Sequence, residues 1–407
     1  MVATDTHRAV EAVWRIECAR VVAGVARMVR DVGLAEELAQ DALVAALEQW
    51  PQSGVPRNPG AWLTSVAKRR AVDLIRRRET YARKLGEIAH ELETTGTDVP
   101  DPAAADLDGE EIDDDLLRLV FVSCHPVLST EARVALTLRL LGGLTTDEIA
   151  RGFLVPEATV AQRIVRAKRT LAQEEVPFEV PGPGERADRL ASVLEVVYLV
   201  FNEGYTATAG EDWVRPSLCT EAMRLGRVLA GLMPDQQEVH CLVALMEIQA
   251  SRLRARTGRS GEAVLLLDQD RALWDEMMIR RGLAALDRAE ALGEGLGPYG
   301  VQAAIAACHA RARTPDGTDW PRIAALYARL AQLVPSPVVE LNRAVAVSMA
   351  LGPAAGLALV DQLGDEPALS TYHLLPAVRG DLLAKLGRHA EARVEFERAA
   401  ALTRNER

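Results

Sequence analysis

A run of cationic side chains between residues 68 and 78 has the chemistry needed to bind phosphate. It contains one lysine and five arginines, and Trp62, Val66 and Leu74 follow a spacing that lets them face inward from the same helix. Arginine and lysine bind the phosphates of nucleic acids with little dependence on sequence. The segment 61–79 therefore predicts a basic helix that binds nucleic acid, with an ordinary solvated helix as the alternative.

A second segment has the spacing of a helix-turn-helix. Thr145 and Glu148 predict a capping box at the start of a short helix, and Pro156 predicts the start of a second helix after a turn. Its outward side carries Glu157, Thr159, Gln162, Arg163, Arg166 and Arg169, and its core is formed by Ile149, Phe153, Val160, Ile164 and Leu171. Because Arg, Gln and Thr reach base edges in the major groove, the segment predicts a DNA-reading helix, with a plain helical hairpin as the alternative.

A third segment, 35–50, predicts a helix with two different faces. One face is apolar and the other is mostly polar, and the polar set repeats at helical spacing. The apolar face has Ala39, Leu43, Ala46, Leu47 and Trp50, and the other has Glu37, Gln40, Asp41, Val44 and Glu48. This second face is either a surface for a protein partner or a solvated acidic side.

Composition indicates that helices position all three segments. Ala, Leu, Arg and Glu dominate, aromatic residues make up 4%, and the 407 residues with 49% hydrophobic content are enough for two or three cores. We therefore predict an all-α protein. From residue 186 onward, apolar-periodic segments of helix length alternate with short turns, as in stacked helical hairpins, and Gly387 is expected to separate the last two helices.

Charge is distributed unevenly along the chain. The net charge is -11, but residues 85–115 alone carry 12 acidic side chains and no Lys or Arg. The rest of residues 1–185 has 22 basic and 18 acidic side chains, so the segments proposed for DNA are basic in an acidic protein. The acidic stretch predicts a solvated linker, and the prolines and glycines of 176–185 predict a second one.

Several kinds of site are not indicated by the sequence. The five cysteines are far apart, so reduced buried thiols and no metal site are expected. No Gly-rich phosphate loop or hydrolase motif is present, which argues against an enzyme, and no cofactor is expected. The absence of a leader or a long apolar run predicts a cytoplasmic protein that does not enter a membrane.

In their order along the chain, 35–50, then 61–79, then the helix-turn-helix, and at this spacing, the three segments resemble the sigma-70 family of RNA polymerase sigma factors, in particular the extracytoplasmic-function (ECF) type, over about residues 10–175. Residues 186–405 resemble the tetratricopeptide-like extension of one ECF subgroup, in stretches such as Phe201–Tyr205, Asp268–Trp274 and Pro335–Val345. The helix-turn-helix departs from the family pattern at Leu154, where glycine is common, so a different turn is expected there.

The resemblance implies partners and a role for individual residues. Core RNA polymerase would be bound, through the β′ clamp helices, by Glu36, Glu37, Gln40, Asp41, Val44 and Glu48. The minus-ten promoter element would be bound by Ser53, Arg57, Asn58, Trp62, Lys68, Arg69, Arg70, Arg76, Arg77 and Arg78. The minus-thirty-five element would be bound by Thr159, Gln162, Arg163, Arg166, Lys168 and Arg169, beside the polymerase β flap.

The predicted organisation is sigma domain 2 at 1–84, an acidic linker at 85–111, sigma domain 4 at 112–175, a Pro/Gly linker at 176–185 and a regulatory helical extension at 186–405. The extension would bind a protein regulator or a ligand. Polar groups beside Trp274, such as Asp268, Asp270 and Arg271, would line a groove or join neighbouring repeats. The competing interpretation is a ligand- or partner-responsive helix-turn-helix regulator that does not join the polymerase.

Overall fold

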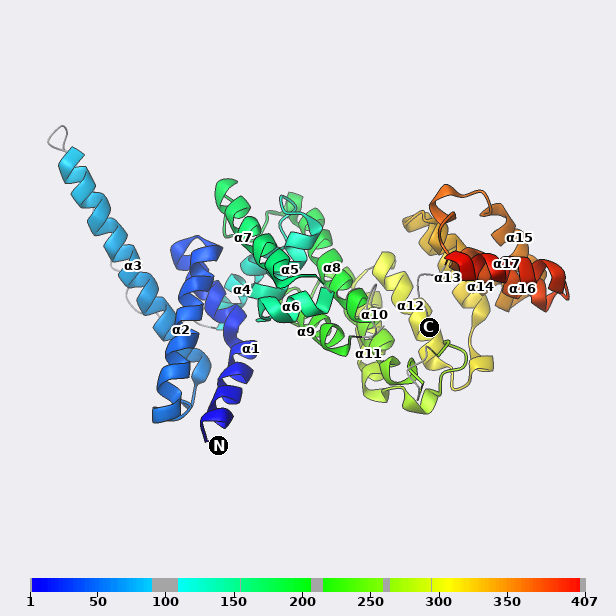
Figure 1. The fold of residues 1–407 in the computed structure, drawn as a ribbon, viewed down its shortest axis with the longest axis horizontal. Helices are drawn as coiled ribbons and strands as arrows, with labels where there is room; N and C mark the ends of the chain where they lie inside the picture. Colours follow the sequence, from blue (N-terminus) through cyan, green and yellow to red (C-terminus); the bar gives the residue numbers. More distant parts are fainter. Residues whose placement is uncertain are drawn as a thin grey trace. The chain divides into compact units, whose positions relative to one another are not determined.

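The computed structural model describes residues 2–89, 109–153, 155–205, 215–258, 264–293 and 295–402. These residues form seventeen α-helices, which confirms the prediction of an all-α protein (Figure 1). The chain divides into two compact units, residues 1–232 and 233–407. In the described parts of the chain, no helix has the length and apolar character needed to cross a membrane.

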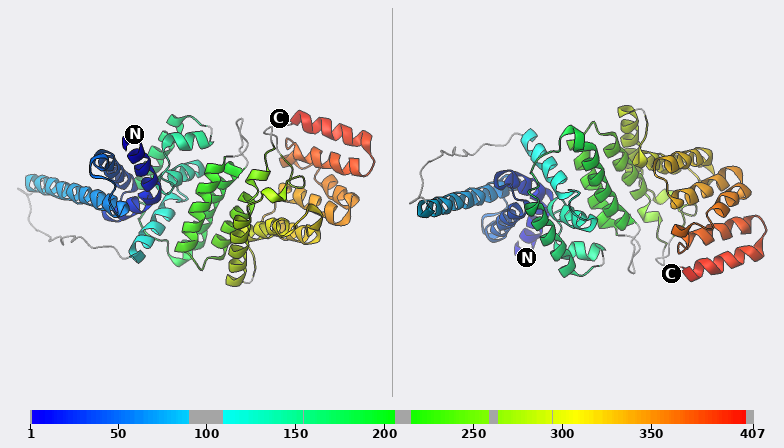
Figure 2. Two further views of the ribbon diagram at one scale, coloured as in Figure 1. Left: turned by 90° about the horizontal axis from the view of Figure 1, so that it is seen from below. Right: turned by 90° about the horizontal axis from the view of Figure 1, so that it is seen from above.

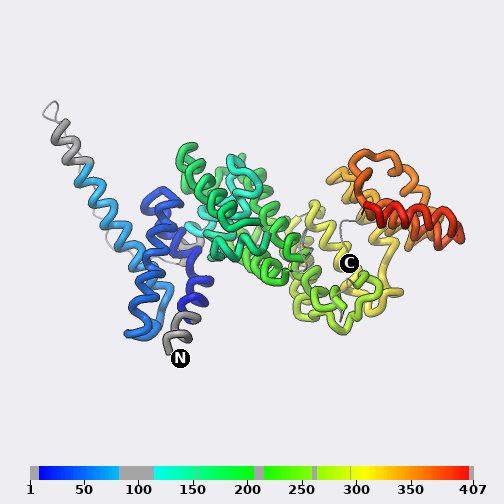
Figure 3. The backbone as a smooth tube through the Cα atoms, in the orientation of Figure 1, coloured from blue at the N-terminus to red at the C-terminus, as the bar shows by residue number. Residues whose placement is uncertain are grey.

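The first unit contains nine of these helices, and α1 lies at its centre. α1 contacts α2, α3 and α4, while α5 contacts both α7 and α8, and α8 pairs with α9 (Figures 2 and 3). The helices are α1 (Val2–Val29), α2 (Val32–Ser53), α3 (Pro59–Ala89), α4 (Gly109–Ser123), α5 (Thr130–Leu140), α6 (Thr146–Phe153), α7 (Glu157–Gln173), α8 (Pro183–Tyr205) and α9 (Pro216–Leu232).

Local chemistry explains where α2 begins and ends. The Asp31 carboxylate accepts a hydrogen bond from the Leu34 amide at 3.0 Å, which caps the first turn. The helix stops at Gly54, whose φ of 81° is easy for glycine and unfavourable for other residues. Near this end the Trp50 ring is almost fully buried and meets the Trp62 ring of α3 edge-on, with 5.4 Å between centroids. The predicted apolar face of α2 therefore packs inward.

The helix-turn-helix forms as the sequence predicts. The Glu148 amide donates to the Thr145 hydroxyl at 3.1 Å, and the Thr145 amide donates to the Glu148 carboxylate at 2.8 Å, which is a complete capping box. Pro156 is the N-cap of α7, and Ile149 and Val160 are both 1% exposed in the core. Leu154, where a different turn was expected, lies outside the described residues.

The two predicted linkers coincide only in part with non-helical segments of the structure. Residues 90–108, most of the predicted acidic linker, lie outside the described residues, and α3 and α4 flank them. Between α7 and α8 the chain is non-helical from 174 to 182, and α8 begins at Pro183. The predicted boundary at residue 186 thus lies within the first turn of α8, and α8 and α9 belong to the same compact unit as the helices before them.

The second unit is a series of helical hairpins. α10 pairs with α11, α13 with α14, and α16 with α17. Its helices are α10 (Gln237–Ala250), α11 (Glu276–Leu292), α12 (Pro298–Arg311), α13 (Trp320–Leu333), α14 (Pro337–Leu351), α15 (Pro353–Gln362), α16 (Leu374–Lys385) and α17 (His389–Leu402). Gly387 separates the last two with a φ of 76°, and its amide donates to the Ala384 carbonyl, so the predicted terminal hairpin is confirmed.

The polar groups beside Trp274 join parts of this unit to one another. The Arg271 guanidinium lies 4.8 Å from the centre of the Trp274 ring and donates to the carbonyls of His309 and Ala312, at the end of α12. Trp274 is 6% exposed. A guanidinium at a helix C-terminus satisfies carbonyls that have no partner within the helix. These contacts favour the structural interpretation of this cluster over a groove.

Candidate polymerase and promoter interface

The polar face of α2 is largely exposed to solvent, although Asp41 on it also pairs with Arg70 of α3. Glu37, Asp41, Val44 and Glu48 are exposed, and Gln40 is half-buried. Val44 has 50% of its surface exposed in the middle of this acidic face. An exposed aliphatic side chain ringed by carboxylates suits a protein partner that offers a small apolar contact with surrounding cations.

Glu36, one residue earlier, is in a different environment. It is 4% exposed, and its Oε1 accepts a hydrogen bond from Arg139 Nε of α5 at 2.6 Å. Gln40, on the next turn of α2, donates to the same oxygen, and the other carboxylate oxygen forms an ion pair with Lys168 of α7. We call these four residues the Glu36 cluster. The cluster joins α2 directly to the helix-turn-helix segment, so Glu36 is not accessible to a partner in this conformation.

The last residue of α2 and the loop that follows it present polar groups to solvent. Ser53, Arg57 and Asn58 are exposed, and the Asn58 side chain accepts a hydrogen bond from the Ala61 amide at 3.1 Å. Asn58 therefore caps α3, in which Pro59 is the first residue. Trp62 follows on α3, half-buried against Trp50. The loop and the first turn of α3 are thereby held in a defined position.

The predicted cations of α3 divide into two groups. Arg69, Arg76, Arg77 and Arg78 are exposed, whereas Lys68 and Arg70 are half-buried. Arg70 Nη1 lies 2.8 Å from Asp41 Oδ2, which ties the basic helix to the acidic face of α2. Both partners are substantially exposed, so this ion pair contributes little stability by itself. The exposed group forms a positive surface suited to phosphates.

The side chains of α7 that are proposed for the major groove also fall into two groups, one exposed and one that contacts α2. Gln162, Arg166 and Arg169 are exposed and follow helical spacing, so they share one face, with Thr159 and Arg163 half-buried near them. Lys168 instead points to Glu36, and its side chain is 22% exposed. The structure therefore brings Lys168 to the Glu36 cluster and leaves the Gln162, Arg166 and Arg169 face open.

Further contacts join α1 to the helices that follow α3. Arg15 pairs with Glu148 of the capping box, and Arg27 Nε lies 3.3 Å from Asp115, which is 1% exposed. Gly143 has a φ of 65°, and a Cβ added there would lie 2.6 Å from Cys18 Sγ. Only glycine fits so close an approach. Together with the Glu36 cluster, these contacts hold α1 and α2 against the helix-turn-helix in one closed arrangement.

Helices α8 and α9 provide hydrogen bonds to the C-terminal carbonyls of α4, α5 and α6. Ser192 donates to the Cys124 carbonyl at 2.8 Å and Arg189 to the Phe121 carbonyl at 3.0 Å, both at the end of α4. The last carbonyls of a helix have no partner within the helix, and cations there are also favoured by its dipole.

The ends of the next two helices are capped in the same way. Arg224 donates to the Leu141 carbonyl, which follows the last residue of α5, and Arg215 donates to the Gly152 carbonyl in α6. Arg215 and Arg224 are each held by a neighbouring carboxylate, from Glu203 and Glu221 respectively. We call Arg189, Ser192, Arg215 and Arg224 the capping residues. They make α8 and α9 part of the frame of the helix-turn-helix.

Sequence patterns did not single out the capping residues or the α1 contacts. Each joins residues far apart in the chain, such as Arg224 and Leu141, and a lone arginine on an amphipathic helix does not indicate where its partner lies. The sequence signal for these contacts is weak, because it consists only of arginines in or directly before the α8 and α9 segments.

Within the described residues, no group of three or more His, Cys, Asp or Glu side chains is arranged to hold a metal ion. All five cysteines are buried and unpaired by disulfides. Burial raises the pKa of the Cys18 thiol to about 12, so this group remains neutral at physiological pH.

Three family models match the chain. Sigma-70 region 2 matches residues 17–81, which run from α1 into α3, and Sigma-70, region 4 matches residues 118–171, which run from α4 into α7. A family of unknown function (DUF6596) matches residues 189–290. No solved structure matches the chain.

Relatives match either most of the chain or less than half of it. An uncharacterized protein of Rhizobium meliloti is 48% identical over 381 residues, 93% of this chain and 88% of that protein. The ECF RNA polymerase sigma factor SigK of Mycobacterium ulcerans is 31% identical over 159 residues, 38% of this chain and 79% of that protein. The probable ECF RNA polymerase sigma factor SigI of Mycobacterium tuberculosis is 30% identical over 176 residues, 43% of this chain and 58% of that protein.

The chain therefore belongs to the sigma-70 family of RNA polymerase sigma factors, as an ECF-type member with a helical C-terminal extension. This confirms the resemblance found in the sequence, and it means that core RNA polymerase and promoter DNA are the partners of the family. The helices α1–α3 hold region 2, and α4–α7 hold region 4.

Proposed function

We propose that this protein directs core RNA polymerase to its promoters through the exposed face of α2 and the basic surfaces of α3 and α7. The β′ clamp helices would meet Glu37, Gln40, Asp41, Val44 and Glu48, and the β flap would meet region 4. The loop of Ser53, Arg57 and Asn58, with Trp62 and the cations of α3, would bind the opened minus-ten strand. Thr159, Gln162, Arg163, Arg166 and Arg169 would read the minus-thirty-five element.

Glu36 and Lys168 have a different role in this proposal. Because the Glu36 cluster is buried between α2, α5 and α7, these two residues hold the closed arrangement and do not contact polymerase or DNA directly in it. Separating a buried ion pair leaves charges without partners, at a cost of about 3 kcal/mol or more when only one partner is removed. Polymerase would therefore compete with the Glu36 cluster when it binds α2.

The observation that carries the proposed role of the extension is the capping of α4, α5 and α6 by α8 and α9. Without the capping residues, the carbonyls of Phe121, Leu141 and Gly152 would lose hydrogen bonds, each contributing about 1 kcal/mol or more. We infer that α8 and α9 are a required support for region 4. The second unit would act as a regulatory domain that binds a protein or a ligand, as stacked helical hairpins commonly do.

Two truncations separate these roles. A chain ending at Leu232 keeps α8 and α9, whereas a chain ending at Glu185 lacks them. Run-off transcription with sigma-free core polymerase should drop by roughly tenfold or more for the shorter chain relative to the one ending at Leu232. Equal transcription by these two chains at equal protein level would contradict the support role.

The same assay tests the second unit. The full chain and the chain ending at Leu232 should differ in transcription, upward or downward, when the second unit regulates the sigma regions. Equal transcription by both, with and without the inducing condition, would reject regulation by residues 233–407. That outcome would leave the support role of α8 and α9 intact.

A further inference from the structure

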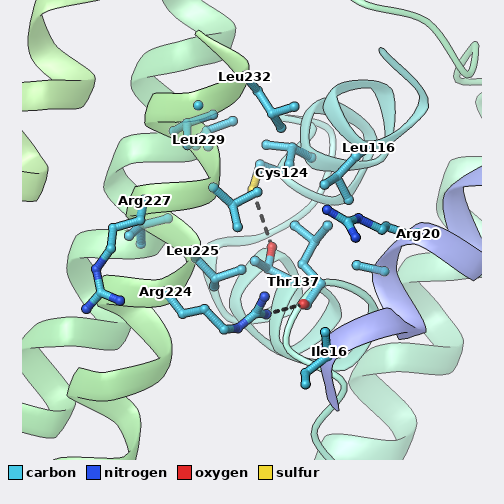
Figure 4. Close-up of a pocket in the computed structure, with 17 residues that line it drawn as sticks. Ile16, Arg20, Leu116, Cys124, Thr137, Arg224, Leu225, Arg227, Leu229 and Leu232 are labelled. Atoms are coloured by element: carbon cyan, nitrogen blue, oxygen red, sulfur yellow. Dashed lines mark hydrogen bonds between the residues drawn. The ribbon is translucent and has the colours of Figure 1, made fainter. Parts of the chain in front are cut away.

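A cavity of about 380 Å³ lies inside the first unit, where α1, α4, α5, α8 and α9 meet (Figure 4). Aliphatic side chains form most of its wall, among them Leu116, Val120, Val193, Val197 and Leu229. These five are each less than 7% exposed, whereas Ile16, which also lines the cavity, is 66% exposed, so the cavity has a wall of core residues and opens to solvent on one side. An apolar cavity of this size holds a small organic molecule.

The interior has few groups that would hydrogen-bond to a ligand. Thr137 and Cys124 contribute polar atoms, but the Cys124 sulfur and the Thr137 hydroxyl lie 3.3 Å apart and satisfy each other. Burial raises the pKa of the Cys124 thiol to about 11, so this thiol is neutral and a poor nucleophile. The body of any occupant must therefore be aliphatic and bound non-covalently.

The mouth of the cavity carries positive charge. The Arg20 side chain is 53% exposed, and its guanidinium extends from α1 toward the cavity, while its ion pair with Glu17 is long at 3.9 Å (Figure 4). Arg224 also lines the cavity but is held by Glu221 and the Leu141 carbonyl. Arg20 is thus placed to accept a new partner, and a planar guanidinium matches a carboxylate with two parallel hydrogen bonds.

We propose that this cavity binds an amphipathic carboxylate, with its aliphatic chain among α1, α4, α5, α8 and α9 and its carboxylate on Arg20. At about 30 Å³ for a group the size of a water molecule, the volume corresponds to a chain of roughly ten carbons. Because region 2, region 4 and the extension all line the cavity, the bound molecule stabilises their closed arrangement by mass action. The binding itself does not depend on the proposed function.

Isothermal titration calorimetry of the full chain with sodium decanoate tests the site, with 1-decanol as the uncharged counterpart. Decanoate should bind saturably at one site per chain. Val197→Phe, which fills the cavity, should abolish the binding. Arg20→Gln changes an exposed side chain and should weaken decanoate by about tenfold while leaving 1-decanol unchanged. Arg30→Gln, in the turn after α1 and outside the cavity lining, is the matched control and should bind decanoate as the wild type does.

The outcomes that overturn the proposal are distinct. If decanoate does not bind saturably, the proposed site does not exist. The same conclusion follows if Val197→Phe binds decanoate as the wild type does while its circular dichroism and melting temperature are normal. If the wild type and Arg20→Gln bind decanoate with equal affinity, Arg20 does not bind the carboxylate. If the wild type binds decanoate and 1-decanol with equal affinity, the cavity does not select a carboxylate. If Val197→Phe does not fold, the Arg20→Gln comparison decides, since loss of the decanoate preference supports the proposal and its retention contradicts it.

Discussion

Lys168, on the helix proposed to enter the major groove, forms an ion pair with Glu36, on the helix proposed to bind polymerase. Arg139 of α5 holds the same carboxylate at 2.6 Å, so one buried anion joins three helices of two sigma regions. In this conformation the two surfaces are connected through their buried sides, while their outer faces remain exposed. Events at one surface are therefore expected to influence the other through Glu36.

Reversing charge on the outer face of α2 should weaken polymerase binding. Glu37→Lys with Asp41→Lys places two cations where the proposed partner offers cations, and like charges at an interface cost several kcal/mol. Affinity for core polymerase, measured by fluorescence anisotropy, should fall by about 100-fold with unchanged circular dichroism. Glu11→Lys, an exposed change on α1, is the control. Wild-type affinity in the double variant would exclude this face as the polymerase site.

Arg166→Ala should change sequence preference at one base pair. Arg166 is exposed on the same face of α7 as Gln162 and Arg169, where a guanidinium can donate two hydrogen bonds to a guanine. Loss of such a contact costs roughly 1–3 kcal/mol at one minus-thirty-five position. Competition binding with a set of single-base variants measures it, with Arg151→Ala on α6 as the control. A uniform loss across all sequences would identify Arg166 as a phosphate contact.

Removing the Arg224 cap should destabilise region 4. Arg224→Met keeps much of the aliphatic stem but leaves the Leu141 carbonyl without its donor, at a cost of about 1–3 kcal/mol. Hydrogen exchange of the α5 amides should speed up accordingly, whereas Arg227→Met, an exposed change on α9, should leave it unaltered. Unchanged exchange in α5 for Arg224→Met would remove the argument that α9 supports this helix.

Acid should weaken the second unit through His309. Burial, with the charges of Arg252 and Arg271, lowers the pKa of His309 to about 4 from an ordinary value near 6.5. Below pH 6.5, His309 therefore binds a proton in the unfolded chain but not in the folded chain. The free energy of unfolding falls as the pH drops from 6.5 to 4. The loss attributable to His309 is roughly 3 kcal/mol.

Urea unfolding of the full chain at pH 7 and pH 4.5 measures this effect, with hydrogen exchange of α12 to locate it. Carboxylates titrate in the same range, so the informative quantity is the difference between the wild type and His309→Gln. The variant should lose less stability on acidification than the wild type. Equal losses in both chains would show that His309 does not sense this change.

Local features were predictable from the sequence because a few neighbouring residues determine them. The Thr145 and Glu148 capping box, the start of α7 at Pro156 and the turn at Gly387 each depend on residues within one helical turn, and all three are present. Helical spacing also placed Glu37, Asp41 and Glu48 on one face of α2, and these three are exposed. The all-α fold followed from the same periodicity.

Long-range contacts were not predictable in this way. Spacing did not put Glu36 on the polar face, and its partner Arg139 lies 103 positions away in the chain, so nothing local indicated a buried ion pair. The same holds for Arg189 and Arg224, whose acceptors are backbone carbonyls and carry no sequence signal at all. Whether the exposed site residues bind polymerase and DNA remains a prediction.

Run-off transcription with sigma-free core polymerase and the Glu36→Ala chain shows whether a buried Glu36 holds the two sigma regions closed. Removing the shared anion leaves Arg139 and Lys168 without their carboxylate partner, which should favour the open arrangement that polymerase accepts. The Glu36→Ala chain should give roughly tenfold more transcript than the wild type at limiting core polymerase, and Glu11→Ala should give the same amount as the wild type. Transcript equal to or below the wild type, from a Glu36→Ala chain with normal circular dichroism, would contradict this expectation and indicate that Glu36 contacts polymerase itself.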